Sequence, residues 1–460
     1  MGNISIDNKA VESQEMLYTR NTQALRRQKM LKRHRQPLVC LTLNITDPVQ
    51  CLPMTERTFN EGCTAMQAHL TAGRIRTTSH EPYMEKTVCE AYYSVAASAD
   101  VVKRIMVALE DTHPLLCLFN IDVLRPDGTK VHRSEIGCAP RKCFLCKLPE
   151  DQCAHNRICQ KEQFQQYARE IIVEYFSEEF SETISKLALR ALLYEVSVTP
   201  KPGLVDRISS GAHKDMDFFS FIDSSCSLIP YFKTCTRMGL KHSDLACEEF
   251  LALLRPEGIL AEKQMFTATK GVNTHKGAIF SLGLLCAAAG RIAARGTGLE
   301  AETLCREAQN LAQCTLGDYL HMDTSANLTG GEAAYVRYGL TGVRGEAASG
   351  FFHVRKISLP ALRHQLGQGS TLNDAGVVAL LHLMGKIEDS YVIKRRGKEA
   401  LEDLHRHVND LLQKGTLTMD GVKALDRFLI EQNISPGGCA DLLAITFFLQ
   451  FISTAPNLNL

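Results

Sequence analysis

Hydrophobic positions follow two different patterns along the chain, and the change falls near residues 165–170. Before it, short apolar runs bounded by proline and polar residues at 38–45 and 115–123 predict strands, and residues 87–109 have helical composition. After it, apolar residues recur at helical spacing in the segments 177–196, 278–294, 301–320, 373–386, 398–413 and 440–452. The pattern predicts two domains, an α+β domain over residues 1–165 and an all-α domain over residues 170–460.

Composition and charge narrow the classes of function. The chain has 52 Lys+Arg and 51 Asp+Glu. This balance disfavours a nucleic-acid partner, because proteins that bind nucleic acids usually have more basic than acidic residues. The N-terminal residues are polar where a signal peptide needs an apolar core, and the longest apolar run, 278–290, is short for a membrane span. We therefore expect a cytoplasmic protein with no membrane partner, reduced cysteines and a buried helix over 278–290.

Four loops of the second domain concentrate charged residues beside glycine and proline. The stiff loop 199–216 carries Lys201, Asp206, His213 and Asp215, and residues 271–283 place Thr274, His275 and Lys276 at the start of an apolar helix, where anions bind readily. The loop 330–351 contains Arg344 and Glu346, and the turn 435–444 contains Asp441. Taken singly, each loop could merely connect helices, and His275 could be a core histidine. Their convergence in an apolar helical domain predicts a polyanionic substrate with bound Mg²⁺.

Residues 180–455 resemble the triphosphoribosyl-dephospho-CoA synthase family, the accessory enzymes of citrate lyase. The matching strings are TPKPGLVD, GAHKDM, NTHKGAIFSLG, GEAAYVRYGLTGVRGEAASGF and SPGGCADLLA; in IEDSYVIKRRG, Asp389 and Arg395 correspond to the family pattern while Ser390 and Tyr391 depart from it. The resemblance implies that ATP loses adenine as its ribosyl C1 joins the 2′-hydroxyl of 3′-dephospho-CoA. Such a glycosyl transfer needs a proton acceptor and cations that hold the triphosphate.

We assign roles to these residues as a hypothesis. Phosphates are bound by Lys201, His275, Lys276 and Arg344, with His213, Thr274 and Arg395 as further substrate contacts. Asp206 and Asp215 hold Mg²⁺ or act as the base. Glu346 is the competing base, followed by Asp389 and Asp441.

Three features of the first domain carry chemistry. Asn120 and Asp122 alternate on one face of a predicted strand and could share a Mg²⁺ ion, with Asp122 also a catalytic candidate; the alternative is an ordinary strand end. The basic stretch 26–35 is most simply a solvated helix face, with phosphate binding as the minority interpretation. The thiols Cys143, Cys146, Cys153 and Cys159, with His155 as a substitute ligand, suit Zn²⁺ or are plain reduced cysteines.

Residues 26–159 are similar to the holo-acyl-carrier-protein synthase of citrate lyase, the phosphoribosyl-dephospho-CoA transferase. The matching strings include LTLNI, HPLLCLFNIDV, PRKCFLC and CAHNRIC. The resemblance implies a nucleotidyltransferase-like fold and attack by a serine of the apo acyl carrier protein on the α-phosphate, which expels pyrophosphate.

This domain departs from its family at several positions, namely Asp47, Gln50, Cys117, Asn120, His155 and Cys159. Losing one carboxylate and two cations should weaken the hold on Mg²⁺ and a triphosphate, so reduced transferase activity is expected. The alternative is a synthase whose first half only docks the carrier protein or lyase. A related malonate decarboxylase system ranks below both.

Overall fold

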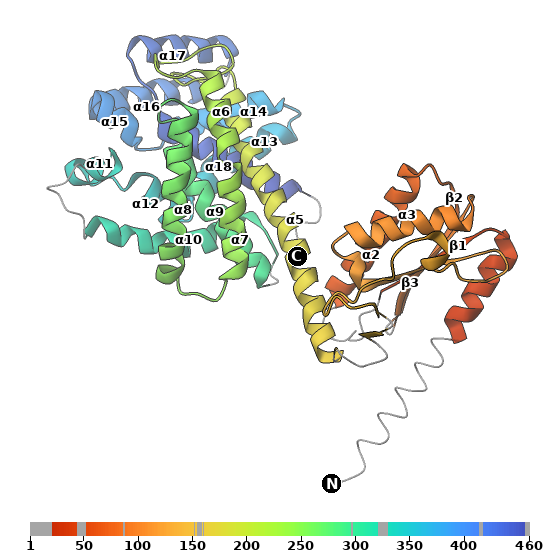
Figure 1. Cartoon of the computed structure of the whole chain (residues 1–460). Coiled ribbons are helices and arrows are strands. Elements are labelled where there is room, and N and C mark those ends of the chain that lie inside the picture. Colours follow the sequence, from red (N-terminus) through yellow and green to blue (C-terminus); the bar gives the residue numbers. More distant parts are fainter. Residues whose placement is uncertain are drawn as a thin grey trace, which may run out of the picture. The chain divides into compact units, whose positions relative to one another are not determined.

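The computed structural model describes residues 21–43, 52–85, 88–150, 152–153, 159, 161–295, 298–320, 330–413 and 417–455. The chain divides into two compact units, residues 1–176 and residues 177–460. The helix α5, Lys161–Ser197, contains the boundary between them (Figure 1). The expected positions Asp47, Gln50 and His155 lie outside the described residues.

Unit 1 is built on a four-stranded antiparallel sheet. Its strands are β1 (Leu38–Leu43), β2 (Thr77–Glu85), β3 (Val88–Val95) and β4 (Phe119–Leu124), in the spatial order β2-β3-β1-β4. Unit 1 also contains the helices α2 (Leu52–Ala72) and α3 (Ala99–Thr112) and the short 3₁₀ turns η1 (Leu116–Leu118) and η2 (Ser134–Ile136). The α+β class expected for this part of the chain is confirmed.

The two faces of the sheet are covered by different helices. On one face, Phe119 lies against Gly62 of α2, and Lys103 of α3 donates to the Ile121 carbonyl at 2.9 Å. On the other face, Met30 of the helix over residues 21–34 (red in Figure 1) packs with a cluster that includes Cys40 and Tyr92. The central strands β1 and β3 are therefore largely buried on both sides, whereas the edge strand β2 is half-exposed.

The double burial explains the main error of the sequence-based assignment. The segment 87–109 was expected to be helical, but the buried strand β3 occupies its first part and α3 only the remainder. The half-exposed edge strand β2 was also missed, and burial does not account for that. A strand covered on both faces loses the alternation of apolar and polar residues that identifies a half-exposed strand. In the same way, the basic stretch is not simply solvated, because Arg26 forms an ion pair at 2.6 Å with the fully buried Glu90.

The regular elements among the described residues of unit 2 are all helices, joined by loops (Figure 1). After α5 come α6 (Phe218–Ser227), α7 (Ile229–Lys241), α8 (Cys247–Ala268), α9 (Lys276–Ala294), α10 (Ala301–Leu320), α11 (Gly330–Tyr338), α12 (Gly342–Ala348), the π-helix η3 (Val354–Ser358), α13 (Leu359–Gly367), α14 (Leu372–Met384), α15 (Ser390–Arg396), α16 (Lys398–Gln413), α17 (Met419–Glu431) and α18 (Gly437–Thr454). The expected all-α architecture is confirmed.

Two helices of unit 2, α9 and α18, are long and apolar enough to cross a membrane, but both are mostly buried inside the unit. Gly239 and Gly290 let α7 and α9 approach closely, since a Cβ at Gly290 would lie 2.1 Å from the Thr236 carbonyl oxygen. The apolar run 278–290 is thus a core helix, as the sequence predicts. The start of α9 and the start of α18 both face the pocket described next.

Candidate functional site

Unit 2 contains a pocket of about 340 Å³ that collects residues from distant parts of the sequence. Its walls come from the end of α5, the loop 199–216, α6, the loop before α9, α15 and the start of α18. Six of the residues singled out in the sequence line it: Lys201, His213, Thr274, His275, Arg395 and Asp441. The structure therefore brings three of the four loops to one cavity.

The loop 199–216 is held in place by Asp206. One carboxylate oxygen accepts the N–H groups of Ile208 and Ser209, both at 2.8 Å, and the other accepts the Lys201 N–H at 3.0 Å. Gly203 has a positive φ of 72°, and a Cβ there would lie 2.4 Å from the Ile434 carbonyl oxygen. Asp206 is buried and is not among the residues that line the pocket, and these three hydrogen bonds join its carboxylate to the loop itself.

A buried ion pair lies in the pocket wall. Lys201 is only 1% exposed, and its Nζ contacts the carboxylate of Glu195 and donates to the Glu195 carbonyl oxygen at 3.2 Å. Burial raises the pKa of Glu195, and the ammonium of Lys201 opposes that rise. Sequence analysis did not single out Glu195, because it lies inside a long amphipathic helix without a motif of its own.

His275 ends a chain of hydrogen bonds. Thr274 Oγ1 donates to Ser224 Oγ at 2.8 Å, and Ser224 Oγ lies 2.7 Å from His275 Nδ1. A serine that accepts from Thr274 and donates to Nδ1 leaves the ring proton on Nε2. Burial, reinforced by Lys201, lowers the pKa of His275 to about 3. The ring is therefore neutral near pH 7, and any phosphate contact it makes is a hydrogen bond rather than a charge pair.

Asp441 is the one carboxylate of the predicted set that lines the pocket. It lies against the start of α9, where the Ala278 N–H donates to it, and a Cβ on Gly277 would come within 2.0 Å of its Oδ2. Burial raises the pKa of Asp441 well above its usual value, and the nearby carboxylates of Glu195 and Asp389 add to the rise. A carboxyl group with a raised pKa is suited to proton transfer near neutrality.

Asp389 does not line the pocket, and its carboxylate accepts hydrogen bonds from backbone N–H groups of the two helices beside it. Its Oδ1 accepts the Tyr391 N–H at 2.8 Å at the start of α15, and its Oδ2 accepts the Cys439 N–H at 3.1 Å. Burial raises the pKa of Asp389. These bonds join α15 to the start of α18, so Asp389 shapes the pocket without lining it.

Polar and positive groups cluster on another part of the lining. His213 Nε2 lies 2.7 Å from Ser435 Oγ, with the exposed Asp215 3.7 Å from its Nδ1. Arg395 donates to the Ala212 carbonyl oxygen at 2.9 Å and lines the pocket together with the exposed Lys394. Sequence analysis missed Lys394, although its position beside Arg395 on the short helix α15 was a usable signal.

The remaining predicted residues of unit 2 are not among those that line the pocket. Lys276 pairs with Glu262 at 2.8 Å. Glu346 accepts from the His353 backbone N–H at 2.9 Å and lies 2.7 Å from His353 Nδ1, which raises the pKa of His353. Arg344 lies with Glu346 on α12.

In unit 1, Asn120 and Asp122 share one face of β4, as their spacing predicts. Both are already paired with cations: Asp122 contacts Lys130 at 2.6 Å, and Arg141 Nη1 lies 3.4 Å from Asn120 Oδ1. Opposite them on β1 are Cys40 and Thr42. This polar end of β4, defined by Asn120, Asp122, Lys130 and Arg141, combines one carboxylate with two cations.

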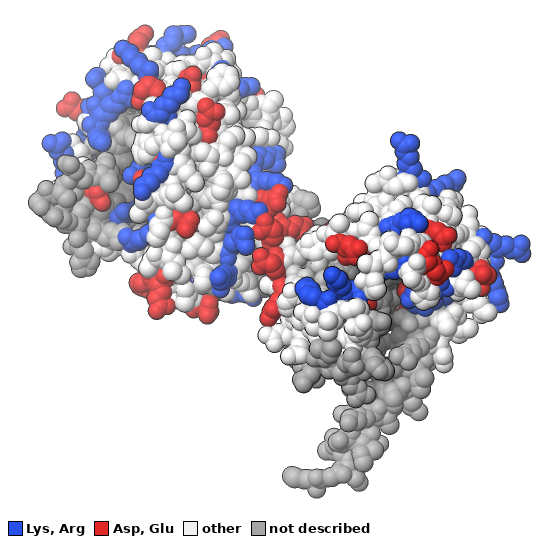
Figure 2. All heavy atoms as spheres, in the orientation of Figure 1, with Lys and Arg blue, Asp and Glu red and all other residues white. Residues whose placement is uncertain are grey.

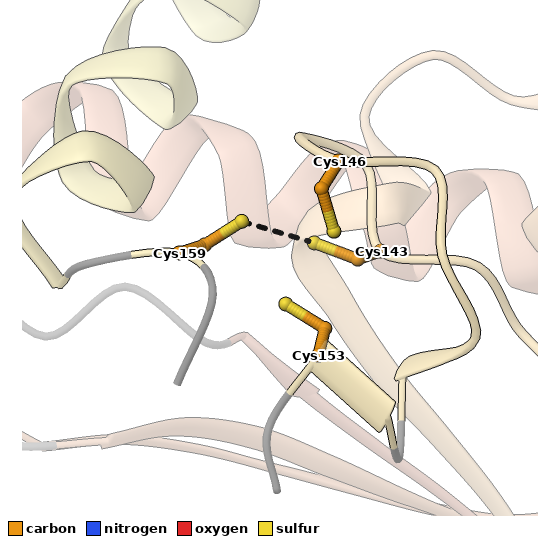
Figure 3. Close-up of side chains that lie close together, drawn as sticks. All are labelled: Cys143, Cys146, Cys153 and Cys159. Atoms are coloured by element: carbon orange, nitrogen blue, oxygen red, sulfur yellow. Dashed lines mark hydrogen bonds between the residues drawn. The ribbon is translucent and has the colours of Figure 1, made fainter. Parts of the chain in front are cut away.

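The four cysteines of the predicted zinc set converge in unit 1 (Figure 3). Their sulfur atoms all lie within 4.8 Å of one another, and the Sγ atoms of Cys143 and Cys159 are 3.9 Å apart, far beyond a disulfide bond. The Leu148 backbone N–H donates to Cys146 and lowers its pKa. The donor set and its compactness fit a single soft cation such as Zn²⁺.

Surface charge is mixed over the visible face of each unit, where basic and acidic side chains are interspersed (Figure 2). This agrees with the near-equal totals of 52 basic and 51 acidic residues.

Comparison with known proteins separates the same two parts of the chain. Residues 181–459 match the CitG family, described as ATP:dephospho-CoA triphosphoribosyl transferase, and residues 11–175 match the CitX family, described as apo-citrate lyase phosphoribosyl-dephospho-CoA transferase.

Full-length relatives combine both parts. Protein CitXG of Haemophilus influenzae is 32% identical over 97% of this chain and 98% of its own length, and Protein CitXG of Leuconostoc mesenteroides subsp. cremoris is 36% identical over 78% of this chain and 80% of its own. The 2-(5''-triphosphoribosyl)-3'-dephosphocoenzyme-A synthase of Pectobacterium atrosepticum is 40% identical over 62% of this chain and 95% of its own.

Proposed function

Because this chain belongs to the CitG and CitX families, joined as a fused citrate lyase accessory protein, we propose that the pocket of unit 2 is where its synthase reaction takes place. The chain is a transferase that makes 2'-(5''-triphosphoribosyl)-3'-dephospho-CoA from ATP and 3'-dephospho-CoA, and transfers the phosphoribosyl-dephospho-CoA group to apo-citrate lyase. The observation that supports the pocket is the convergence of six predicted residues from three loops and α15 on one cavity.

Asp441 is the acid–base group in this proposal. The 2′-hydroxyl of dephospho-CoA attacks C1′ of the ATP ribose and the C1′–N9 bond breaks. Adenine leaves with the bonding electrons and takes up a proton from solvent, while the triphosphate stays attached to the sugar. Asp441 accepts the hydroxyl proton, since it is the one predicted carboxylate in the pocket lining and the Ala278 N–H and the charge of Lys201 both favour its ionised form. Arg395 and Lys394 bind phosphate oxygens, and His275 donates a hydrogen bond as a neutral ring.

Mg²⁺ fits Asp206 poorly, because both carboxylate oxygens of Asp206 already accept backbone N–H groups. The exposed Asp215 is the remaining candidate ligand from the same loop, and a Mg²⁺ ion carried by the ATP phosphates would supply charge neutralisation there. In unit 1 the polar end of β4 likewise already contains Lys130 and Arg141, so it suits phosphate oxygens better than a second cation.

Unit 1 carries the transfer step, and its partner in this proposal is the acyl carrier protein subunit of apo-citrate lyase. The proposal includes a nucleotidyltransferase-like fold, supported by the polar pair Asn120 and Asp122 on one strand face, a Zn²⁺ ion on the four clustered thiols, and a cytoplasmic location.

Release of free adenine tests the synthase assignment. The purified chain with ATP, Mg²⁺ and dephospho-CoA should release adenine, and Asp441→Asn should fold normally yet lose this activity. Asp206→Ala and Glu346→Ala test the other two bases proposed from the sequence. We expect the Asp206 variant to lose adenine release because its loop becomes disordered, and the Glu346 variant to release adenine faster than the Asp206 variant. Full turnover by Asp441→Asn would refute its role as the base.

A second experiment tests whether unit 1 is active or only a docking module. Triphosphoribosyl-dephospho-CoA and the apo carrier protein are mixed with the full chain, and the mass of the carrier is measured. Transfer adds the phosphoribosyl-dephospho-CoA group to the carrier, whereas an unchanged carrier mass would favour docking alone.

A further inference from the structure

The four-thiol cluster has the dimensions of a tetrahedral zinc site. Zn–S bonds of about 2.3 Å place the sulfurs of a ZnS₄ tetrahedron about 3.8 Å apart. The Cys143–Cys159 separation is 3.9 Å, and all four sulfurs lie within 4.8 Å of one another. Figure 3 shows the side chains directed at a common centre from separate stretches of chain. One pair of thiols thus has the separation of a ZnS₄ tetrahedron, and the other separations are at most about 1 Å longer.

The cluster is continuous with a small hairpin that begins at Arg141. Its two arms are joined by bonds from the Cys143 N–H to the Leu148 carbonyl at 2.7 Å and from the Glu150 N–H to the Arg141 carbonyl at 2.9 Å. Cys143 and Cys146 lie in the hairpin, and Lys147 takes the positive φ of 61° that its tight turn requires. A metal bound here closes the hairpin onto Cys153 and Cys159 and fixes the backbone of Arg141 at its base.

The Arg141 side chain points from this hairpin to β4. Its Nη2 donates to the Cys117 carbonyl oxygen at 2.8 Å, and its Nη1 lies 3.4 Å from Asn120 Oδ1 and 3.6 Å from a carboxylate oxygen of Glu110. Glu110 also pairs with Arg133 at 2.7 Å, so one buried carboxylate serves two guanidinium groups. Glu150 also lies 3.7 Å from Arg141 Nε and Asp111 lies 3.0 Å from Arg133, so carboxylates hold both guanidinium groups in place while Arg141 Nη1 faces the exposed Asn120.

We infer that a zinc ion bound by the four thiols fixes the hairpin that begins at Arg141. The fixed hairpin positions the Arg141 side chain to bind the phosphates of the transferase substrate at the polar end of β4. The inference rests on the proposed transfer reaction of unit 1. In that reaction the carrier serine oxygen forms a bond to the α-phosphorus and the bond from that phosphorus to the β-phosphate oxygen breaks. Pyrophosphate leaves with the bonding electrons, and the serine proton passes to solvent. Arg141 is the substrate-binding residue, and the four cysteines are positioning residues.

Metal content is the first measurement. The full chain, purified under reducing conditions with zinc supplied, should contain about one zinc per chain by elemental analysis. Cys146→Ser should lose it, and the matched control Cys138→Ser, a thiol of the same segment outside the cluster, should keep it. A parent chain that neither contains nor takes up zinc would overturn the inference whatever its activity.

The two activities of the chain provide an internal control. Arg141→Gln should keep its zinc and its adenine release but transfer the prosthetic group roughly tenfold to a hundredfold more slowly, because a charge-assisted phosphate contact is lost. Lys142→Gln removes a neighbouring charge and should leave both rates unchanged. Cys146→Ser, or removal of the metal with a chelator, should slow transfer alone, and zinc added back to the chelated parent should restore it.

The double variant Cys146→Ser/Arg141→Gln decides whether loss of zinc slows transfer by displacing Arg141. If it does, the double variant transfers no more slowly than the slower single variant; multiplied losses would overturn the positioning role. A zinc-free Cys146→Ser that transfers at the parental rate would also overturn it. A parent chain that releases adenine and binds zinc but transfers nothing refutes the proposed transfer reaction. The role of Arg141 in substrate binding is then refuted as well, whereas the zinc site is confirmed.

Discussion

Acid should destabilise unit 2 through one buried histidine. His275 is 2% exposed, and its surroundings lower its pKa from an ordinary value of 6.5 to about 3. Between these values the unfolded chain takes up a proton that the folded chain does not, so stability falls as the pH drops below about 6.5. The sign follows from the lowered pKa, since the neutral ring is the folded form.

The size of the effect follows from linkage. At about pH 5 the unfolded ring is almost fully protonated, and folding must remove that proton at a cost of about 2 kcal/mol, compared with about 0.2 kcal/mol at pH 7. The result depends little on the folded pKa as long as it stays below about 4. Substitution of His275 by Gln, which keeps a hydrogen-bonding amide but does not titrate, should remove this pH dependence.

Urea unfolding of the full chain, followed by far-UV circular dichroism, measures the change because the helices of unit 2 dominate the signal. Between pH 7 and pH 5 the parent should lose about 2 kcal/mol more stability than His275→Gln. The exposed His364, replaced by Gln, is the control and should follow the parent. Parallel stability curves for the parent and His275→Gln would show that the ring takes up its proton in the folded state and would refute the account of a neutral buried histidine.

Three further outcomes are expected. Asp441→Asn should lower the rate of adenine release by at least about a hundredfold with an unchanged far-UV spectrum, and a loss below about twofold would contradict its role. Gly277→Ala should also slow adenine release, because its Cβ would meet Asp441 Oδ2 at 2.0 Å, whereas Gly317→Ala, with open space around it, should keep the parental rate; equal rates in the two variants would refute the close-contact argument. Asn120→Asp should raise the transfer rate by about tenfold if this position contacts the substrate's metal ion, because a carboxylate binds Mg²⁺ better than an amide does; slower transfer, measured by mass spectrometry of the carrier protein, would show that the position faces phosphate oxygens instead.

The sequence determined the larger divisions of this protein. A helical period from residue 170 onward requires each helix to bury one stripe, so an all-α unit 2 follows from the pattern alone. The spacing of Cys143, Cys146, Cys153 and Cys159 indicated a shared ligand set, because short loops can bring such thiols together. Glycine- and proline-rich loops identified most of the pocket, since they fix charged side chains at helix ends.

Only the tertiary structure decided which of those charged residues face the pocket. Asp206, Asp389 and Asp441 are equivalent in the sequence, each a carboxylate in a loop or helix start. All three accept backbone N–H groups, but only Asp441 lines the cavity. Glu195 became visible only once α5 placed it against Lys201.

The same limit applies to burial and charge. The helix over residues 21–34 covers the sheet and hides the alternation of β3, and the neutral state of His275 depends on neighbours that are 50 residues away or more along the chain. Local sequence records which groups a segment carries, whereas their solvation and partners are set by elements that meet only in the folded chain. For that reason the chemistry of this protein was predictable by residue type, and its geometry was not.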